Sequence, residues 1–310
     1  MSVDATVATT ANLSSRAIAW QRRKAATRRF VTAFGHHKAG VFGVAMLVAF
    51  VVLGLLAPVL FPREMIESIN TVGVNPLMAP PSAEFWLGTD EKGRSILALL
   101  VWAIRPSLLV GISASIIAMI LGTVIGISSG HFRNWFGAVC ERITDWFLVI
   151  PFIPLVIVLA AVFGQQGDWI LIVVLGFTSW PGTARLVRAQ TLSVEGRPYL
   201  ERAKVLGNSD WKQMSRHVLP NVMPLVIANT TLTVAIVILS QTTLAFIGLT
   251  DPNSVNWGSM LDNASASGAP ARGAWWYLLP PGICVILVVL AFTLIGRALE
   301  VVLNPRLGSE

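Results

Sequence analysis

Hydrophobic positions in this chain gather into long uninterrupted runs, rather than alternating with polar positions or recurring along one helix face. Most runs extend for about 20 residues, the length that an α-helix needs to cross the hydrocarbon core of a bilayer. Backbone groups in lipid must be hydrogen-bonded internally, which a helix achieves within one segment. The six predicted spans are Gly40–Leu60, Ser107–Ile127, Ile143–Phe163, Trp169–Arg185, Val222–Ile247 and Tyr277–Ile295. The pattern predicts an all-α integral membrane protein with six transmembrane helices.

Composition agrees with a membrane protein and excludes several other classes. Of the 310 residues, 54% are hydrophobic and 13% are charged, whereas a soluble domain has about a quarter charged residues. Collagen-like, disordered and disulfide-scaffold proteins are excluded, and a soluble globular enzyme is disfavoured. Cys140 and Cys284 lie in separate apolar stretches, and no histidine has metal-ligand spacing. We therefore expect no metal site in this chain.

The net charge of +7 could indicate either nucleic-acid binding or membrane topology. Between the predicted spans, eighteen of the 23 Lys and Arg residues fall on one side and five on the other. The positive-inside rule then places both termini in the cytoplasm. With the acids included, the inner side is +10 and the outer side −3. The charge is thus a topology signal, and no nucleic-acid partner is expected.

The spans divide the chain into segments with distinct compositions. We expect a basic cytoplasmic tail (1–39), a first span (40–61), an extracytoplasmic loop (62–106), a core of five further helices (107–298) and a cytoplasmic C-terminal tail (299–310). Within the basic tail, Ala17–Phe30 interleaves cations with apolar residues. It is interpreted either as an amphipathic helix on anionic membrane lipid or as a solvated tail.

No residue pattern for catalysis or ion transport is found in the predicted spans. Apart from Arg185, which ends the fourth span, the only charged residue inside them is Asp145, near the start of the third, where an interfacial cluster or a pair with Arg142 explains it. The chain has no H-E-x-x-H motif, no G-x-S-x-G motif and no G-x-x-x-x-G-K-[ST] phosphate loop. An energised function would need a motor outside this chain.

Two spans have a residue pattern that suggests a role for one helix face. Small residues recur every four positions through the second span, at Ala114, Ala118, Gly122, Gly126 and Gly130. They predict close helix packing, either within the chain or against a second membrane subunit. The fifth span contains polar side chains, among them Asn229, Thr233, Ser240 and Gln241. These are candidates for lining a hydrophilic pathway, and hydrogen bonding between helices is the alternative.

The inner loop 186–221 contains the most informative segment. A short helix is expected over Tyr199–Leu206, and Gly207-Asn208 is a natural stop because both residues tolerate a left-handed backbone. A second helix is expected from Ser209 or Asp210 to Leu219, with Pro220 marking the return to the membrane. Two short helices joined by a tight turn would form a compact knob that could dock into another protein's groove.

This segment resembles the pattern E-A-A, three residues, G, nine residues, I-x-L-P of permease subunits in bacterial ABC importers. The matching residues are Glu201, Ala203, Gly207, Leu219 and Pro220, and the departures are Arg202 and His217. His217 begins His-Val-Leu-Pro-Asn, which is typical of the dipeptide and oligopeptide (DppC/OppC) branch. The Arg202 departure leaves the knob intact but makes its surface more charged.

Further motifs resemble the same branch. The outer loop has the G-T-D-x-x-G-R motif at Gly88, Thr89, Asp90, Gly93 and Arg94. After the fifth span, Asn-Trp-Gly-Ser-Met-Leu contains Trp257 and Gly258. The tail Asn304-Pro305-Arg306-Leu307 also fits. These four motifs occur in the right order and on the predicted sides, and the resemblance extends from about Gly35 to Leu307.

The resemblance implies a type I ABC importer permease fold in the bacterial inner membrane. Implied partners are a paralogous (DppB/OppB-like) permease, two ATPase subunits that bind ATP and Mg²⁺, an extracytoplasmic solute-binding protein and membrane lipid; this chain needs no cofactor. The expected ATPase-coupling residues are Tyr199, Leu200, Glu201, Arg202, Ala203, Gly207, Leu219 and Pro220. The expected binding-protein contacts are Gly88, Thr89, Asp90, Gly93, Arg94, Trp257 and Gly258.

The expected function is ATP-driven import of dipeptides or oligopeptides, with this chain as one permease and not as an enzyme. Nickel chelates and haem-like ligands are alternatives within the same architecture. A stand-alone channel or carrier is an alternative from another class. A membrane enzyme would need catalytic groups that the sequence does not contain.

Overall fold

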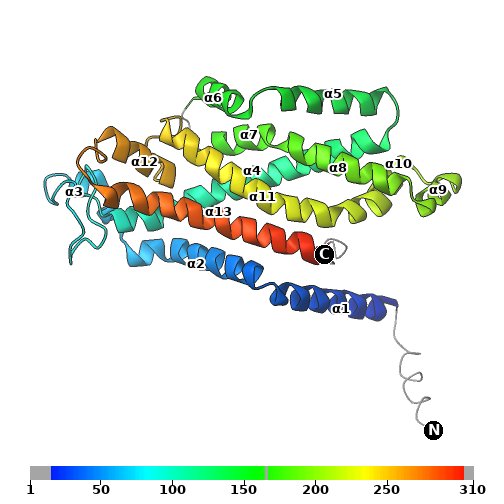
Figure 1. Cartoon of the computed structure of the whole chain (residues 1–310), viewed down its shortest axis with the longest axis horizontal. Helices are drawn as coiled ribbons and strands as arrows, with labels where there is room; N and C mark the ends of the chain where they lie inside the picture. Colours follow the sequence, from blue (N-terminus) through cyan, green and yellow to red (C-terminus); the bar gives the residue numbers. More distant parts are fainter. Residues whose placement is uncertain (1–14, 165–166, 304–310) are drawn as a thin grey trace, which may run out of the picture.

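The computed structural model of the chain describes residues 15–164 and 167–303, which form an elongated bundle of helices (Figure 1). No β-strand occurs in these two ranges, where Thr89 and Ser95 form an isolated β-bridge. In chain order the elements are α1 (Ser15–His36), α2 (Lys38–Leu60), η1 (Arg63–Met65), α3 (Ser68–Thr71), α4 (Ile96–His131), α5 (Trp135–Val149), α6 (Phe152–Phe163), α7 (Asp168–Thr178), α8 (Trp180–Glu195), α9 (Pro198–Val205), α10 (Asp210–Gln213), the π-helical η2 (Met214–Val218), α11 (Leu219–Phe246), α12 (Trp257–Ala266) and α13 (Trp275–Leu303).

Five helices in the described ranges are long and apolar enough to cross a membrane. They are α2, α4, the joined pair α7–α8, the continuous helix Asp210–Phe246, and α13. The pair α5–α6 reaches the same length and hydropathy together, with a bend of 91° between its halves. The predicted all-α membrane fold is confirmed, with five candidate spans, or six where the bent pair is counted as one span.

The bend replaces the straight third span that hydropathy predicts over Ile143–Phe163. It lies at Ile150 and Pro151, where Ile150 has an extended backbone (φ −70°, ψ 126°). A proline ring disfavours helical dihedrals at the residue before it and removes one N–H donor. The hydropathy pattern does not indicate the bend because the residues on both sides of it are apolar.

Three helices extend beyond the predicted membrane segments. α4 begins at Ile96 rather than near Ser107, with Ser95 Oγ accepting a hydrogen bond from the Ala98 N–H. α8 continues to Glu195, and a helix resumes at Asp210. The segment between the fourth and fifth spans is therefore residues 196–209, instead of the predicted loop 186–221. Hydropathy locates the part of a helix inside the bilayer, whereas a helix can continue with polar residues outside it.

α4 is the central helix of the bundle and packs against α2, α7, α8 and α11. Its glycines Gly122, Gly126 and Gly130 face α8. A Cβ atom added at Gly126 would lie 2.6 Å from the Ala184 carbonyl oxygen and 2.8 Å from Val187 Cβ. One added at Gly130 would lie 2.8 Å from Thr191 Cβ. The structure thus supports the interpretation that this stripe serves packing within the chain.

A bulky side chain in this stripe should separate α4 from α8. We expect Gly126→Leu to destabilise the protein by about 1–3 kcal/mol, because the backbone of α8 blocks the added atoms. The midpoint of thermal unfolding in detergent measures the effect. Gly282→Leu is the matched control, since a Cβ added at Gly282 of α13 meets no atom within 4 Å. Equal midpoints for the two variants would contradict the packing argument.

α5 is joined to α8 by two ion pairs. Arg185 Nη2 lies 2.8 Å from Asp145 Oδ1, and Arg188 Nη2 lies 2.8 Å from Glu141 Oε2. Asp145 therefore pairs with a residue of the next span, which agrees with the expected interfacial cluster rather than with the alternative pair to Arg142. All four side chains are at least 32% exposed, so each pair adds little to stability.

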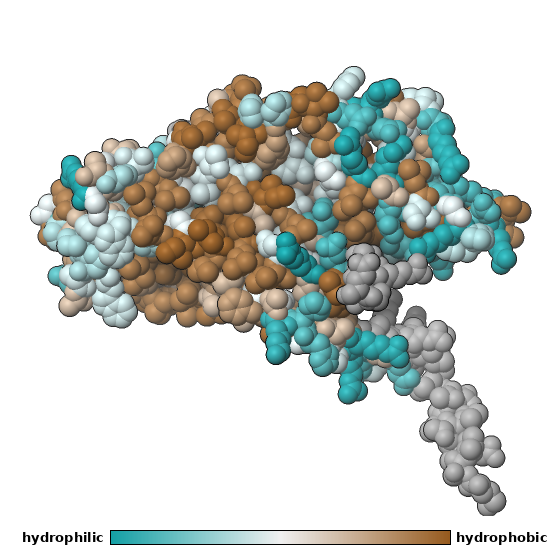
Figure 2. Space-filling view, in the orientation of Figure 1, coloured by the Kyte–Doolittle hydropathy of each residue, from teal (hydrophilic) through white to brown (hydrophobic). Residues whose placement is uncertain are grey.

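The surface separates into an apolar middle and hydrophilic ends. Figure 2 shows hydrophobic residues over the middle of the bundle and hydrophilic residues over the α9 end and α1. Figure 1 places α9 at the same end of the bundle as the last turns of α13, with α3 and α12 at the opposite end. We call these the α9 end and the α12 end. An apolar middle with polar ends is the surface that a membrane-embedded bundle needs.

Candidate functional site

The segment at the α9 end forms the short helix and glycine stop that the sequence predicts. α9 starts with Pro198 in its first turn, where a missing N–H costs no hydrogen bond. Gly207 has φ +74°, and its N–H donates to the Lys204 carbonyl at 2.9 Å. The next N–H, of Asn208, donates to the Ala203 carbonyl at 3.1 Å. These bonds satisfy the last carbonyls of α9 and reverse the chain toward α10.

One side of α9 is buried against the bundle. Leu200 is fully buried and Ala203 is 6% exposed, and Leu200 belongs to an apolar cluster with Val194, Val218 and Val222. Those valines come from the end of α8 and from the helix Asp210–Phe246. α9 is therefore packed against two spans.

The other side of α9 has no cover from the described chain. Val205 is 87% exposed, Leu206 81% and the nearby Trp211 76%. Glu201 and Arg202 are exposed beside them, and Tyr199 is 39% exposed. We call Glu201, Arg202, Val205, Leu206 and Trp211 the α9 face. Large apolar side chains on a polar helical tip are typical of a surface that another protein covers.

The second helix of the predicted knob is the beginning of a span. It does not end at Leu219, because α10, η2 and α11 run on as one helix from Asp210 to Phe246. Leu219 is half-buried and starts α11, whereas Pro220 is exposed inside the helix. The π-helical turn Met214–Val218 ends two residues before Pro220, so the missing N–H of the proline falls in the first turn of α11. The knob is therefore α9 together with the tip of a membrane-spanning helix.

Sequence reasoning missed the residues that attach α9 to the bundle by charge. Lys204 Nζ lies 2.6 Å from Glu195 Oε2, and His131 Nδ1 lies 2.5 Å from Glu195 Oε1. His131 and Glu195 are 64 positions apart, so no local spacing indicates the contact. The available signal is that Glu195 is the only acidic residue of α8, and a glutamate that becomes buried needs a partner.

At the α12 end, the G-T-D-x-x-G-R motif forms a tight loop around a buried carboxylate. Asp90 Oδ2 accepts from Arg94 Nε at 2.6 Å, and Oδ1 accepts from the N–H groups of Arg94 and Lys92 at 2.7 and 2.9 Å. Burial raises the pKa of the Asp90 carboxyl, and the Arg94 guanidinium opposes that shift. Gly88 and Gly93 both have φ +74°, which glycine adopts without strain. The motif shapes the loop.

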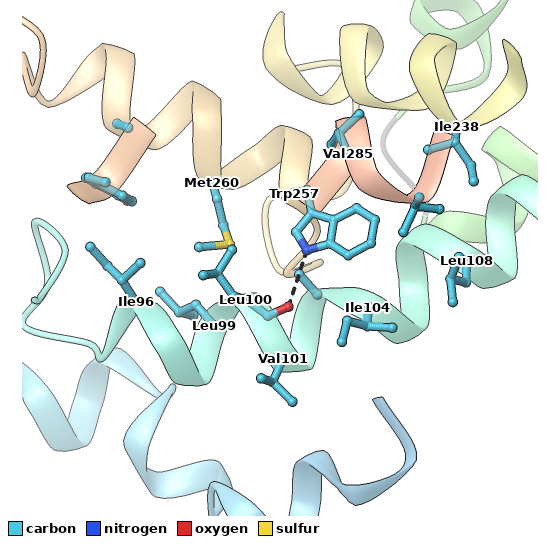
Figure 3. Packing of buried hydrophobic residues seen from close by; sticks show 14 of the residues in the cluster. Ile96, Leu99, Leu100, Val101, Ile104, Leu108, Ile238, Trp257, Met260 and Val285 are labelled. Atoms are coloured by element: carbon cyan, nitrogen blue, oxygen red, sulfur yellow. Dashed lines mark hydrogen bonds between the residues drawn. The ribbon is translucent and has the colours of Figure 1, made fainter. Parts of the chain in front are cut away.

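Trp257 and Gly258 also lie inside the structure. Trp257, the first residue of α12, is fully buried, and its indole N–H donates to the Leu100 carbonyl of α4 at 3.3 Å (Figure 3). A Cβ added at Gly258 would lie 2.5 Å from Ala245 Cβ. The pair therefore fixes α12 against α4 and α11.

Most of the expected binding-protein contacts are buried in this chain, and contact with a binding protein stays a prediction for the set. Thr89, Asp90 and Trp257 have no exposed surface, and Gly88, Gly93 and Gly258 are buried. The exposed apolar residues of the same outer loop are Met65, Ile69, Val72, Val74, Leu77 and Trp86. A partner at this end would contact the latter residues, while the motif holds the loop that presents them.

Removing the Asp90 carboxylate should loosen this loop. Asp90→Ala leaves two backbone N–H groups and the mostly buried Arg94 guanidinium without their acceptor, which costs about 3–5 kcal/mol. We expect faster proteolysis of residues 62–95 in membrane vesicles. Asp251→Ala is the control, because Asp251 accepts a bond from Asn253 N–H in an exposed turn. Equal cleavage of both variants would show that Asp90 does not hold the loop.

The polar residues of the fifth span divide into two groups. Asn229 and Thr233 line a hollow of about 340 Å³ beside the α5–α6 bend, and Asn229 Nδ2 donates to Thr183 Oγ1 at 3.0 Å. Ser240 and Gln241 are buried among the helices, and Ser240 Oγ donates to the Ile236 carbonyl. The Gln241 amide has no hydrogen-bond partner among the described residues. Hydrogen bonding between helices thus occurs at Asn229, and pathway lining stays a prediction for all four.

Comparison with known proteins gives related chains over most of this length. The family model described as "Binding-protein-dependent transport system inner membrane component" matches residues 122–309. The Di/tripeptide transport system permease protein DppC of Pseudomonas aeruginosa is 33% identical over 90% of this chain and 92% of its own length. The Oligopeptide transport system permease protein OppC of Lactococcus lactis subsp. cremoris is 31% identical over 85% and 90%. The Dipeptide transport system permease protein DppC of Alkalihalophilus pseudofirmus is 33% identical over 88% of each chain.

Proposed function

This chain belongs to the family of binding-protein-dependent transport system inner membrane components, and we propose that it works as one permease of an ATP-driven importer of short peptides. The membership makes it a multi-pass membrane permease subunit of the peptide (DppC/OppC) type and not an enzyme. The ATP-driven import, the partners and the substrate are the proposal.

The observation that carries the proposal is the α9 face. Val205, Leu206 and Trp211 are each more than three-quarters exposed. Val205 and Leu206 lie at the end of α9, which packs directly against the ends of two spans, and Trp211 lies at the tip of one of those spans. A motor protein that covers this face would bury its apolar side chains and could form ion pairs with Glu201 and Arg202. Its movement would reach α8 and the helix Asp210–Phe246 through packed contacts. ATP and Mg²⁺ belong to that motor.

The orientation follows from the distribution of charge. The segments at the α9 end contain most of the Lys and Arg residues of the chain, which favours the cytoplasmic side. Both termini are then cytoplasmic, and the α12 end faces outward. A solute-binding protein would dock there, over the exposed residues of the outer loop. A paralogous permease would complete the pathway beside the hollow lined by Asn229 and Thr233.

In this arrangement the chain supplies a path and a coupling element. ATP binding would close the two motor subunits, move both permeases at their α9 ends, and shift the equilibrium between inward-open and outward-open states. Since the helix Asp210–Phe246 spans the bundle, a tilt at α9 would change the position of Asn229 and Thr233. Hydrolysis would then restore the resting state.

Peptides are the favoured substrate because the related chains carry the names of dipeptide, tripeptide and oligopeptide permeases. A strain lacking this chain should lose uptake of labelled di- and tripeptides, and the cloned gene should restore it. The same strain is tested with nickel and with haem. Loss of nickel or haem uptake with normal peptide uptake would overturn the substrate, and unchanged uptake of all three would overturn the function.

A further inference from the structure

A group of ionisable side chains around a buried carboxylate connects four elements at the α9 end. Glu195, the last residue of α8, has a side chain that is 1% exposed. Its Oε1 lies 2.5 Å from His131 Nδ1, and its Oε2 lies 2.6 Å from Lys204 Nζ. His131 is 2% exposed, and its Nε2 lies 3.4 Å from Asp210 Oδ1. The side chains of Lys204 and Asp210 reach the surface, with 45% and 63% exposed. We call these four residues the Glu195 cluster.

The members of the cluster come from parts of the chain that must keep their positions together. His131 ends α4, Lys204 lies in α9, and Asp210 begins the helix Asp210–Phe246. The Glu195 carboxylate lies at the end of α8, in the fourth span. It is therefore the shared partner of His131 from the second span and of Lys204 from α9. Apolar contacts of Leu200 join α9 to the same elements, but apolar contacts allow sliding, whereas directed hydrogen bonds fix an orientation.

Burial of the Glu195 carboxylate makes its contacts with His131 and Lys204 costly to break. A buried carboxylate without partners is strongly disfavoured, so both oxygens of Glu195 hold their donors wherever α9 moves. The Glu195 cluster also differs from the other ion pairs at this end. The acids of the Glu141–Arg188 and Asp145–Arg185 pairs are at least 40% exposed, whereas Glu195 is 1% exposed. Those two pairs also join α5 to α8 without including α9.

We propose that Glu195 is the positioning residue through which movement of α9 is transmitted to α4 and α8. The inference rests on the proposed function, because it assigns to Glu195 a role in coupling the motor to the permease. Lys204 ties α9 to the carboxylate, and His131 ties the carboxylate to the second span. When the motor displaces the α9 face, the two spans move with it as one unit.

The test compares variants of the full transporter, purified with its ATPase subunits and binding protein and reconstituted into vesicles. Glu195→Gln keeps the shape of the side chain and removes its charge. We expect it to lower ATP-driven peptide uptake about tenfold or more, while the ATPase subunits co-purify in the wild-type ratio. Glu141→Gln is the matched control, since it removes an acid from the same end without touching α9, and its uptake should stay within about twofold of wild type.

A second pair of variants separates transmission from folding. Lys204→Met keeps the aliphatic stem and should lower uptake as Glu195→Gln does, whereas Lys204→Arg should preserve it. The double variant Glu195→Gln/Lys204→Met should lose no more than the more impaired single variant, because one link is broken in both cases. Losses that multiply in the double variant would overturn the inference, as would normal uptake by Glu195→Gln.

The remaining outcomes are also decisive. Loss of the ATPase subunits from the Glu195→Gln complex would show a role in assembly and would overturn transmission. A tenfold loss in Glu141→Gln would show that any charge removal at this end has the effect. Absence of ATP-driven uptake by the wild-type complex would overturn the proposed function itself. If the wild-type complex takes up peptide and the Glu195→Gln variant does so equally well, only the Glu195 inference is overturned.

Discussion

Replacing Gly207 with proline should abolish peptide uptake while leaving the protein in the membrane. Gly207 has φ +74°, and its N–H closes the end of α9 on the Lys204 carbonyl. Proline fixes φ near −65° and has no N–H, so the turn between α9 and α10 cannot form as it is. The strain is about 3 kcal/mol or more, which corresponds to at least about a hundredfold loss of the correctly folded turn.

The measurement is ATP-driven uptake in vesicles, normalised to the amount of permease detected in the membrane. Gly207→Asn is the matched control, because asparagine tolerates the left-handed backbone and keeps the N–H. It should retain most of the uptake. Normal uptake by Gly207→Pro would show that the turn after α9 has no part in coupling.

A charge placed on the α9 face should release the ATPase subunits. Leu206 is 81% exposed, directly before the Gly207 turn. In an interface, truncation of a central apolar residue costs about 2 kcal/mol or more, and a buried unpaired carboxylate adds to that cost. We therefore expect Leu206→Glu to weaken ATPase binding by at least about thirtyfold. The free permease should keep its thermal stability, since the side chain touches little of the chain.

The binding constant is measured with purified permease in detergent and labelled ATPase subunits. Trp135→Glu is the matched control, because Trp135 is 74% exposed on α5 and lies outside the α9 face. ATPase binding by this control should match wild type. Unchanged binding by Leu206→Glu, or equal loss in both variants, would place the motor elsewhere on the molecule.

The sequence could predict the spans and the stop after α9, because both follow from local properties. Runs of apolar residues indicate burial in lipid, and the pair Gly207-Asn208 indicates a left-handed backbone at the end of a helix. The bend at Pro151 is harder to predict from the sequence. Proline next to an apolar residue permits a kink, but the 91° angle depends on how α5 and α6 pack. Similarly, Pro220 suggested a helix boundary, yet the π-helical turn before it keeps the helix continuous.

The candidate sites were predictable to the extent that exposure could be inferred. Val205 and Leu206 were expected on a docking knob, and the structure leaves both exposed. Asp90 and Trp257 belong to motifs at the expected end but are fully buried, because a motif can be needed for the shape of a loop as well as for contact. The Glu195–His131 contact could not be predicted, since it joins helix ends that only the tertiary fold brings together.

The most direct test of the proposed coupled permease is peptide uptake by vesicles that contain the complete transporter. The wild-type chain is reconstituted with its paralogous permease and ATPase subunits, with the binding protein and a labelled tripeptide on the α12 side and ATP supplied to the α9 side. We expect accumulation that needs both ATP and the binding protein, and that Gly207→Pro eliminates. Equal uptake without ATP, or transport by this chain in the absence of the ATPase subunits, would contradict it.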